Sequence, residues 1–219
     1  MQYKLSPSTL SLFKDCPRCF WLQLNKGIKR PAGIFPSLPS GMDRILKIHF
    51  DSFMKKGLLP PELKELTGSV KLFDDQKLLE VWQNNFEGVR WKDDNGNTLF
   101  GAIDNLLVKG DKLIVLDFKT RGFPCKEDTH GYYQDQMDIY NFLLRKNGYM
   151  TEDYTYLLFY HPEKVNEKGH VEFNTNLKKI PANPENAEKI FKKALETLNE
   201  LEPKAGEKCE YCRFQAIEK

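Results

Sequence analysis

The sequence predicts an α/β (α+β) fold in which a central mixed sheet, containing an antiparallel meander, is flanked by helices. Two neighbouring runs rich in Leu, Ile and Val, roughly 102–108 and 113–119, are typical of buried strands. Gly110-Asp111 joins them, and a two-residue loop with Gly first favours a type II′ hairpin turn. These runs predict the centre of the sheet.

A second turn signal places another strand beside this hairpin. The stretch 93–97, Asp-Asp-Asn-Gly-Asn, separates strands expected near 87–92 and 98–103. The result is a three-stranded antiparallel meander whose second and third members are the strands of the hairpin. Two further strands are expected near 153–160 and 170–175.

Apolar residues at helical spacing predict the flanking helices. The first helix spans 7–25, where Ser6 suits the N-cap and Gly27 suits the C-terminal stop. Pro17 lies inside this span and should kink or restart the helix. The remaining helices are expected at about 40–56, 74–86, 130–146 and 184–201.

The hairpin turn fixes which side chains face each other. If Val108 faces Leu113, the same count places Asp104 opposite Asp117, with their Cβ atoms about 4.5–5.5 Å apart. Lys119 lies two residues beyond Asp117 and therefore on the same face of the strand. The hairpin thus directs two carboxylates and one ammonium group at one point.

A structural explanation of these charges is also open. Asp104 could cap a strand end, and Asp117-X-Lys119 could lie on a solvated edge. The flanking residues 106–108 and 113–116 are apolar on both faces, however, which indicates a central and buried pair of strands. Because buried carboxylates need a metal or a paired cation, the pattern favours a metal site.

Composition and charge are those of an ordinary globular protein. The chain has 219 residues, of which 40% are hydrophobic and 29% charged, and we expect one domain over 1–219. A net charge of +2 does not by itself indicate a polyanionic partner, so a nucleic-acid groove would require local clustering. Without a signal-peptide core or an apolar run near 18 residues, we expect a cytoplasmic protein that does not contact membranes.

Four of the five cysteines form two Cys-X-X-Cys pairs near opposite ends of the chain, Cys16–Cys19 and Cys209–Cys212. That spacing lets two sulfurs converge on one metal, and two pairs supply four ligands. Four unrelated thiols are the alternative. In a cytosolic chain, however, cysteines favour metal or redox chemistry over disulfides.

A closed four-cysteine site would join the N-terminal segment (1–30) to the C-terminal segment (203–219). Residue types alone leave zinc and an iron–sulfur cluster open, since both accept four thiolates. Cys125 lies in a loop expected over 121–130 and is interpreted as a bystander.

Three motifs together resemble those of one enzyme family. They are Gly101-Ala-Ile-Asp104 followed after a dozen residues by Asp117-Phe-Lys119, the pair Gln136 and Tyr140 spaced as Gln-X-X-X-Tyr, and the N-terminal run 5–18. This pattern resembles the PD-(D/E)XK nuclease superfamily and, within it, the RecB-like branch. That branch includes nuclease domains of recombination helicases and CRISPR-associated adaptation exonucleases of the Cas-four type.

The resemblance implies a restriction-endonuclease-like core and a metal-dependent DNA nuclease, an exonuclease acting on single-stranded ends. Asp104 and Asp117 would bind Mg²⁺ or Mn²⁺ together with His49 and the backbone carbonyl of Phe118. A lone His on an apolar helical stripe is otherwise more often a packed core residue, and that alternative remains open for His49.

The resemblance also assigns roles to three further residues. Lys119 would orient or deprotonate the attacking water, and Gln136 and Tyr140 would position the nucleic-acid strand. The alternative for the last two is an aromatic stripe that packs on the sheet. At the cysteines, the resemblance favours a [4Fe-4S] cluster over zinc, although relatives with one N-terminal and three C-terminal cysteines differ from the paired spacing here.

Two other classes of function remain compatible with the sequence. The chain could be a catalytically weak module that binds nucleic acid or a partner protein, or a structural module stapled by a metal. The segment 26–40, with three basic residues at its start, could be a solvated loop or a strand that contacts nucleic-acid backbone. As an enzyme, it would serve DNA repair, recombination or CRISPR adaptation, with a helicase or adaptation protein as a possible partner.

Overall fold

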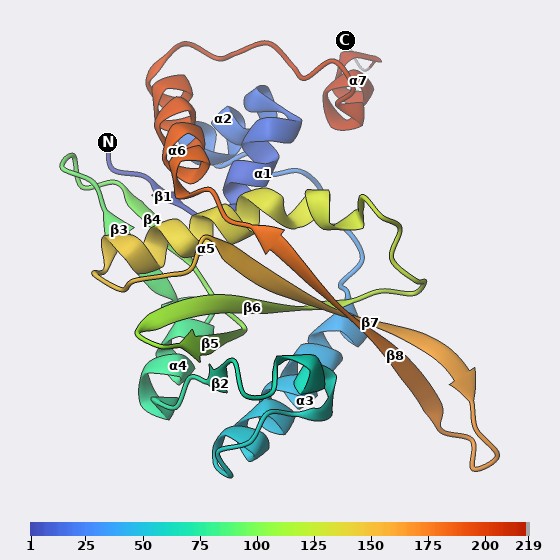
Figure 1. The fold of residues 1–219 in the computed structure, drawn as a ribbon. Coiled ribbons are helices and arrows are strands. Elements are labelled where there is room, and N and C mark those ends of the chain that lie inside the picture. Colours follow the sequence, from blue (N-terminus) through green and yellow to red (C-terminus); the bar gives the residue numbers. More distant parts are fainter. Residues whose placement is uncertain (218–219) are drawn as a thin grey trace.

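The computed structural model describes residues 1–217 and is built on two sheets (Figure 1). The larger sheet is mixed, because β6 and β7 are parallel whereas its other neighbouring strands are antiparallel. Its order is β2 (Lys71–Leu72), β5 (Asn105–Lys109), β6 (Lys112–Thr120), β7 (Tyr154–Val165), β8 (Val171–Pro181). The smaller sheet has the order β1 (Lys4–Leu5), β4 (Thr98–Gly101), β3 (Val89–Lys92).

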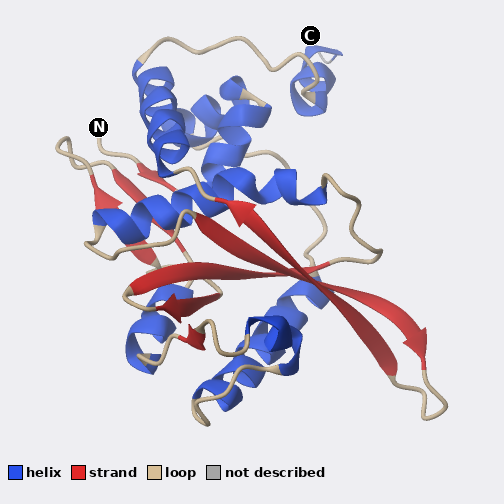
Figure 2. Ribbon diagram, in the orientation of Figure 1, coloured by secondary structure: helices blue, strands red, loops and turns tan. Residues whose placement is uncertain are grey.

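Helices cover both faces of the larger sheet (Figure 2). They are α1 (Pro7–Asp15), α2 (Pro17–Lys26), α3 (Ser37–Met54), α4 (Gln76–Gln83), α5 (Gln134–Lys146), α6 (Pro184–Asn199) and α7 (Glu210–Ile217), with 3₁₀ turns η1 (Pro61–Leu66) and η2 (Thr129–Tyr133). None of the helices in residues 1–217 has the length and apolar character needed to cross a bilayer.

The alternation of side chains along β6 separates two cores. Leu113 and Val115 face α5, α6 and the N-terminal helices, whereas Ile114 and Leu116 face α3 on the other side. Each face of the sheet is thus covered by helices because both sets of strand residues are apolar. This layering confirms the predicted class, a mixed α/β fold with a central mixed sheet flanked by helices.

The predicted meander is wrong in its membership. Instead of continuing in one sheet, the chain leaves β4 at Gly101 and enters β5 of the larger sheet at Asn105. Between them the backbone N–H of Ile103 donates to the carbonyl of Trp82, at the end of α4, and not to a neighbouring strand. The antiparallel run of the central sheet is therefore β2–β5–β6, while β3 and β4 form a hairpin beside β1.

Local signals placed the helices better than the sheets. The predicted first helix restarts at Pro17, with Cys16 as the N-cap of α2, and ends at Gly27, whose φ of 70° suits a C-cap. Three elements were missed because each depends on partners distant in sequence: β1, β2 and α7. Strands β7 and β8 also extend beyond their predicted ends, to Val165 and Pro181, and the part of their twisted ribbon next to the β7–β8 turn projects from the body (Figure 1).

Candidate active site and four-cysteine site

The β5–β6 hairpin has the predicted register. Val108 pairs with Leu113 and Asn105 with Leu116, and Gly110 has a φ of 61° at the turn. One further step places Asp104 opposite Asp117, but Asp104 lies just outside the ladder. Its Oδ2 instead accepts a hydrogen bond of 2.8 Å from the backbone N–H of Phe118.

The two carboxyl groups share one buried site. Asp117 is 1% exposed, and the carboxyls are close enough for one to hydrogen-bond the other when protonated. Burial and the neighbouring Asp117 raise the pKa of Asp104 to about 7, against opposing effects of Lys47 and Lys119. Burial likewise raises the pKa of Asp117. Both acids are therefore charged at neutral pH only when a cation lies close by.

Lys119 supplies one such cation. Its Nζ lies 2.5 Å from Asp117 Oδ2 and donates to Gln136 Oε1 at 3.0 Å. The Asp117 contact is not aligned as a hydrogen bond, so this buried oxygen has no hydrogen-bond donor among the described residues. Burial acts to lower the pKa of Lys119, but Asp117 and Asp104 outweigh it and raise that pKa. The lysine is therefore an ammonium group at neutral pH.

Helix α5 brings the predicted Gln136 and Tyr140 to the same point. Gln136 Nε2 donates to the Tyr140 hydroxyl at 2.7 Å, which makes a continuous chain of contacts from Lys119 to Tyr140. Burial and the two aspartates raise the pKa of Tyr140 well above its usual value. Gly101 allows this approach, since a Cβ there would lie 2.6 Å from Tyr140 Cε1.

Helix α3 contributes two residues that the sequence reasoning missed. Lys47 Nζ lies 2.9 Å from Asp43 Oδ2 and 3.5 Å from Asp104 Oδ1. Asp43 and Lys47 are four residues apart and flank the apolar stripe of Met42 and Leu46. This spacing was the sequence pattern that could have identified them as site residues. A charged pair on a helix is usually exposed to solvent, so this pattern alone does not place the pair in a site. Only the packing of α3 on β6 does so.

The structure does not bring His49 to the carboxylates. Its Nε2 lies 3.1 Å from Glu62 Oε1 in η1, and its ring packs edge-on against Phe50 and Phe53. Asp43 and Lys47 point from α3 to the site, whereas His49 lies on a different side of the helix. The side chains of Lys47 and His49 differ by about half a turn around the axis of α3, so only one of them can face the carboxylates.

The residues around the two carboxylates line an open cavity of about 810 Å³, and His49 is not among them. Its walls come from α1, α3, the β4–β5 connection, β6 and α5, and the backbone around Phe118 is part of them. The segment expected to be either a loop or a strand is irregular up to residue 36, and its Phe35 reaches the cavity rim. The arrangement of two acids, a lysine and an open cavity can bind a cation and an anionic ester side by side.

Comparison with known protein families agrees with this geometry. The family model of the PD-(D/E)XK nuclease superfamily matches residues 73–217, which include the hairpin, α5 and the C-terminal cysteine pair. The chain belongs to this superfamily. No match was found among curated proteins.

Besides the hairpin of the PD-(D/E)XK superfamily, the chain contains a four-cysteine site. Cys16, Cys19, Cys209 and Cys212 are buried, none forms a disulfide, and their sulfurs all lie within 4.8 Å of one another. Individual Sγ–Sγ distances are 3.5 Å for Cys19–Cys212, 3.6 Å for Cys19–Cys209 and 3.8 Å for Cys16–Cys212. The predicted convergence of the two pairs is confirmed.

The surroundings of the four-cysteine site favour the thiolate form of Cys16 and the thiol form of Cys212. Burial acts to raise the pKa of Cys16, but hydrogen bonds from the backbone N–H groups of Gly206 and Cys19 outweigh it and lower that pKa to about 6. Burial and the other sulfurs raise the pKa of Cys212 to about 12. Four thiols so close together cannot all ionise without a cation, which is the condition for a tetrathiolate metal site.

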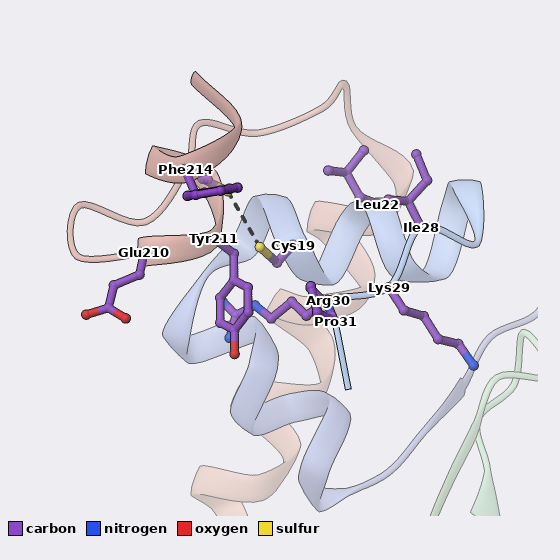
Figure 3. A pocket seen from close by; sticks show the side chains of 10 residues that line it. Cys19, Leu22, Ile28, Lys29, Arg30, Pro31, Glu210, Tyr211 and Phe214 are labelled. Carbon is purple, nitrogen blue, oxygen red and sulfur yellow. Dashed lines mark hydrogen bonds between the residues drawn. The ribbon is translucent and has the colours of Figure 1, made fainter. Parts of the chain in front are cut away.

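A basic residue of the segment after α2, Arg30, lies next to the four-cysteine site, and Figure 3 shows it beside the Tyr211 ring. Arg30 donates to Cys209 Sγ at 3.3 Å, pairs with Asp15 at 2.6 Å and lies over the Tyr211 ring. Beside it is an apolar cavity of about 520 Å³ between α2 and α7, into whose lining Figure 3 places Tyr211 and Phe214. Cys125 takes no part in the site.

Proposed function

We propose that the protein is a divalent-metal-dependent nuclease that hydrolyses phosphodiester bonds in DNA. The observation that carries the proposal is the carboxylate pair of half-buried Asp104 and buried Asp117, which lines an open cavity beside Lys119. This is the arrangement after which the PD-(D/E)XK superfamily is named, and the family match covers it.

The carboxylates fit a divalent cation. Asp117 Oδ2 is buried without a hydrogen-bond donor among residues 1–217, and hard oxygen ligands suit Mg²⁺ or Mn²⁺. Asp104, Asp117 and the Phe118 carbonyl would hold the ion, which supplies Lewis-acid activation of the attacking water and of the phosphate. Asp43 is a better candidate than His49 for completing the site, because it lines the cavity.

Lys119 acts by its charge in this proposal. Because the aspartates raise its pKa, it is protonated and suits stabilisation of the developing negative charge better than abstraction of a proton from water. Gln136 fixes the ammonium group through its 3.0 Å hydrogen bond, and Tyr140 fixes Gln136. Tyr140 is buried and Lys119 and Gln136 are half-buried, so the two hydrogen bonds are partly shielded from water.

The chain of contacts from Lys119 to Tyr140 also supports the RecB-like branch, in which a Gln-X-X-X-Tyr helix accompanies the nuclease motifs. We therefore propose exonuclease action on single-stranded ends, in DNA repair, recombination or CRISPR adaptation, alongside a helicase or an adaptation protein. Phe35 at the rim and Phe100 in the wall offer aromatic surfaces on which unpaired bases can stack.

At the cysteines we propose a single four-coordinate ion. Zinc–sulfur bonds of about 2.3 Å in a tetrahedron place the sulfurs about 3.8 Å apart. Three of the six sulfur pairs are 3.5–3.8 Å apart and all lie within 4.8 Å, which supports this geometry. A [4Fe-4S] cluster, favoured by the resemblance, binds each thiolate to a different iron and needs a wider ring of sulfurs. The ion would tie residues 1–30 to residues 203–219.

The test of the nuclease is cleavage of end-labelled single- and double-stranded DNA with Mg²⁺, Mn²⁺ or EDTA. The parent should cut only with metal, and Lys119→Met and Asp117→Asn should lose at least about 100-fold in rate while still binding DNA. Gln76→Met, a change at a half-buried residue of α4 outside the cavity, is the control. If the parent protein binds DNA but does not cut it, the nuclease proposal is wrong and the protein is a catalytically weak binding module.

The test of the cysteine site is the metal content of the purified protein. One zinc per chain is expected, with loss of that ion in Cys209→Ser and its retention in Cys125→Ser. Four irons per chain and a visible absorption band would instead establish the cluster.

A further inference from the structure

The face of β6 that carries Asp117 and Lys119 continues beyond Lys119. The ladder to β7 continues past Thr120, because the backbone N–H of Arg121 donates to the Tyr160 carbonyl at 2.8 Å. Side chains alternate along this extended backbone, so Asp117, Lys119 and Arg121 share one face. The pairing of Thr120 with Tyr160 then sets Arg121 beside His161 of β7.

Arg121 and His161 each keep a buried nitrogen without a partner. Within the described part of the chain, Arg121 Nε and His161 Nδ1 have no hydrogen-bond partner, and no carboxylate lies within ion-pair distance of Arg121. A buried polar group without a partner costs free energy, and native structures keep few of them. Two such groups on adjacent strands indicate a ligand that satisfies both.

The charges around Arg121 and His161 favour an anionic ligand. Opposite this part of β7, strand β8 presents Asn174 and Asn176, which pair with His161 and Phe159, and then Lys178. Arg121 and Lys178 both act on the Cys125 thiol, where they oppose the effect of burial on its pKa, so the two cations lie near the same point. The acids of the nearby loop, Glu127 and Asp128, are exposed.

We propose that Arg121 and His161 form a phosphate-binding subsite for the nucleic-acid substrate, next to the phosphate held at Lys119. The proposal rests on the proposed nuclease function. A guanidinium group binds phosphate through two parallel N–H donors, and the imidazole adds another donor. Residues two apart on a strand are about 7 Å apart, so Lys119 and Arg121 contact different phosphates of the same backbone.

The test measures binding of a single-stranded oligonucleotide in an Asp117→Asn background, in which cleavage is suppressed. Arg121→Gln should weaken binding several-fold and reduce the slope of log K against log salt by about 0.7, the value for one lost phosphate contact on a single strand. Arg121→Lys should restore the slope. In the cleaving background, Arg121→Gln should raise KM and change kcat less.

The matched control is Arg90→Gln, which removes an exposed arginine of the smaller sheet whose side chain, among residues 1–217, bonds the carbonyls of Phe86 and Glu87 alone. If Arg121→Gln has the affinity and salt slope of Arg90→Gln, the subsite is overturned while the nuclease proposal stands. If the Asp117→Asn parent binds no nucleic acid and the wild type cuts none, both proposals fail. Thermal unfolding of each variant identifies a loss that is due to misfolding.

Discussion

Lys119 Nζ donates a 3.0 Å hydrogen bond to Gln136 Oε1, so a lysine of the sheet is oriented by a residue of helix α5. The same amide donates to Tyr140 at 2.7 Å, which leaves the Gln136 side chain no freedom to turn over. The position of the ammonium group beside Asp117 thus depends on how α5 packs on β6.

Replacement of Gln136 should affect rate more than binding. In Gln136→Met the lysine loses its acceptor and can swing away from the scissile phosphate, and small displacements of this kind cost about 10- to 100-fold in rate. Single-turnover cleavage at saturating DNA measures the effect. Gln76→Met, whose amide contacts only Glu80 on the surface, is the control. An unchanged rate in Gln136→Met would mean that Lys119 is held by Asp117 alone.

Asp43 should matter more than His49 for metal affinity. Asp43→Asn removes the carboxylate that pairs with Lys47 beside Asp104, and loss of a supporting group typically weakens metal binding about 10- to 100-fold. His49→Ala only releases Glu62 and should leave the Mn²⁺ dependence of cleavage unchanged. Titration of cleavage against Mn²⁺ measures both. The opposite order of effects would show that His49 reaches the ion in the loaded enzyme.

The raised pKa of Asp104 predicts how stability depends on pH when no Mg²⁺ or Mn²⁺ is added. In the folded protein this carboxyl titrates near pH 7, against about 3.9 when unfolded, so between these values only the folded state holds the proton. Stability should therefore fall as pH rises from about 4 to 7 and level off above. Asp104→Asn, which removes the charge, should gain on the order of 1–3 kcal/mol over the parent at pH 8 and little at pH 4.

Urea unfolding at pH 4, 5.5, 7 and 8 gives this comparison. Asp153→Asn is the control, because Asp153 is exposed and paired with Arg145, which lowers its pKa, so its loss should not stabilise the protein at pH 8. A gain of equal size for Asp104→Asn at every pH would mean that Asp104 is already ionised throughout the range.

Gly101 should not tolerate a side chain. A Cβ there would lie 2.6 Å from Tyr140 Cε1, so Gly101→Ala must displace the ring that holds Gln136. We expect a loss of about 1–3 kcal/mol in unfolding free energy together with slower cleavage. Gly131→Ala, where an added Cβ meets nothing within 4 Å, is the control. Equal melting temperatures for the two variants would show that Tyr140 can move without cost.

Local sequence patterns determined the parts of this protein that depend on neighbours in the chain. The Gly110-Asp111 turn set the register of the hairpin, and the two-residue period of a strand then placed Lys119 on the face of Asp117. Residues four apart on a helix share a face, which placed Gln136 and Tyr140 together. Paired cysteine spacing was enough to predict one four-cysteine site.

Tertiary structure decided what depends on the packing of distant elements. Helical periodicity identifies the buried stripe of α3, but only its contact with β6 selects Asp43 and Lys47 for the cavity and leaves His49 with Glu62. The division of β4 and β5 between two sheets depends on the contact of Ile103 with Trp82. The pairing of Arg121 with His161 arises from a parallel crossover of more than thirty residues. Turn chemistry and side-chain periods act over a few residues, whereas the position of one element on another is set by the whole buried surface between them.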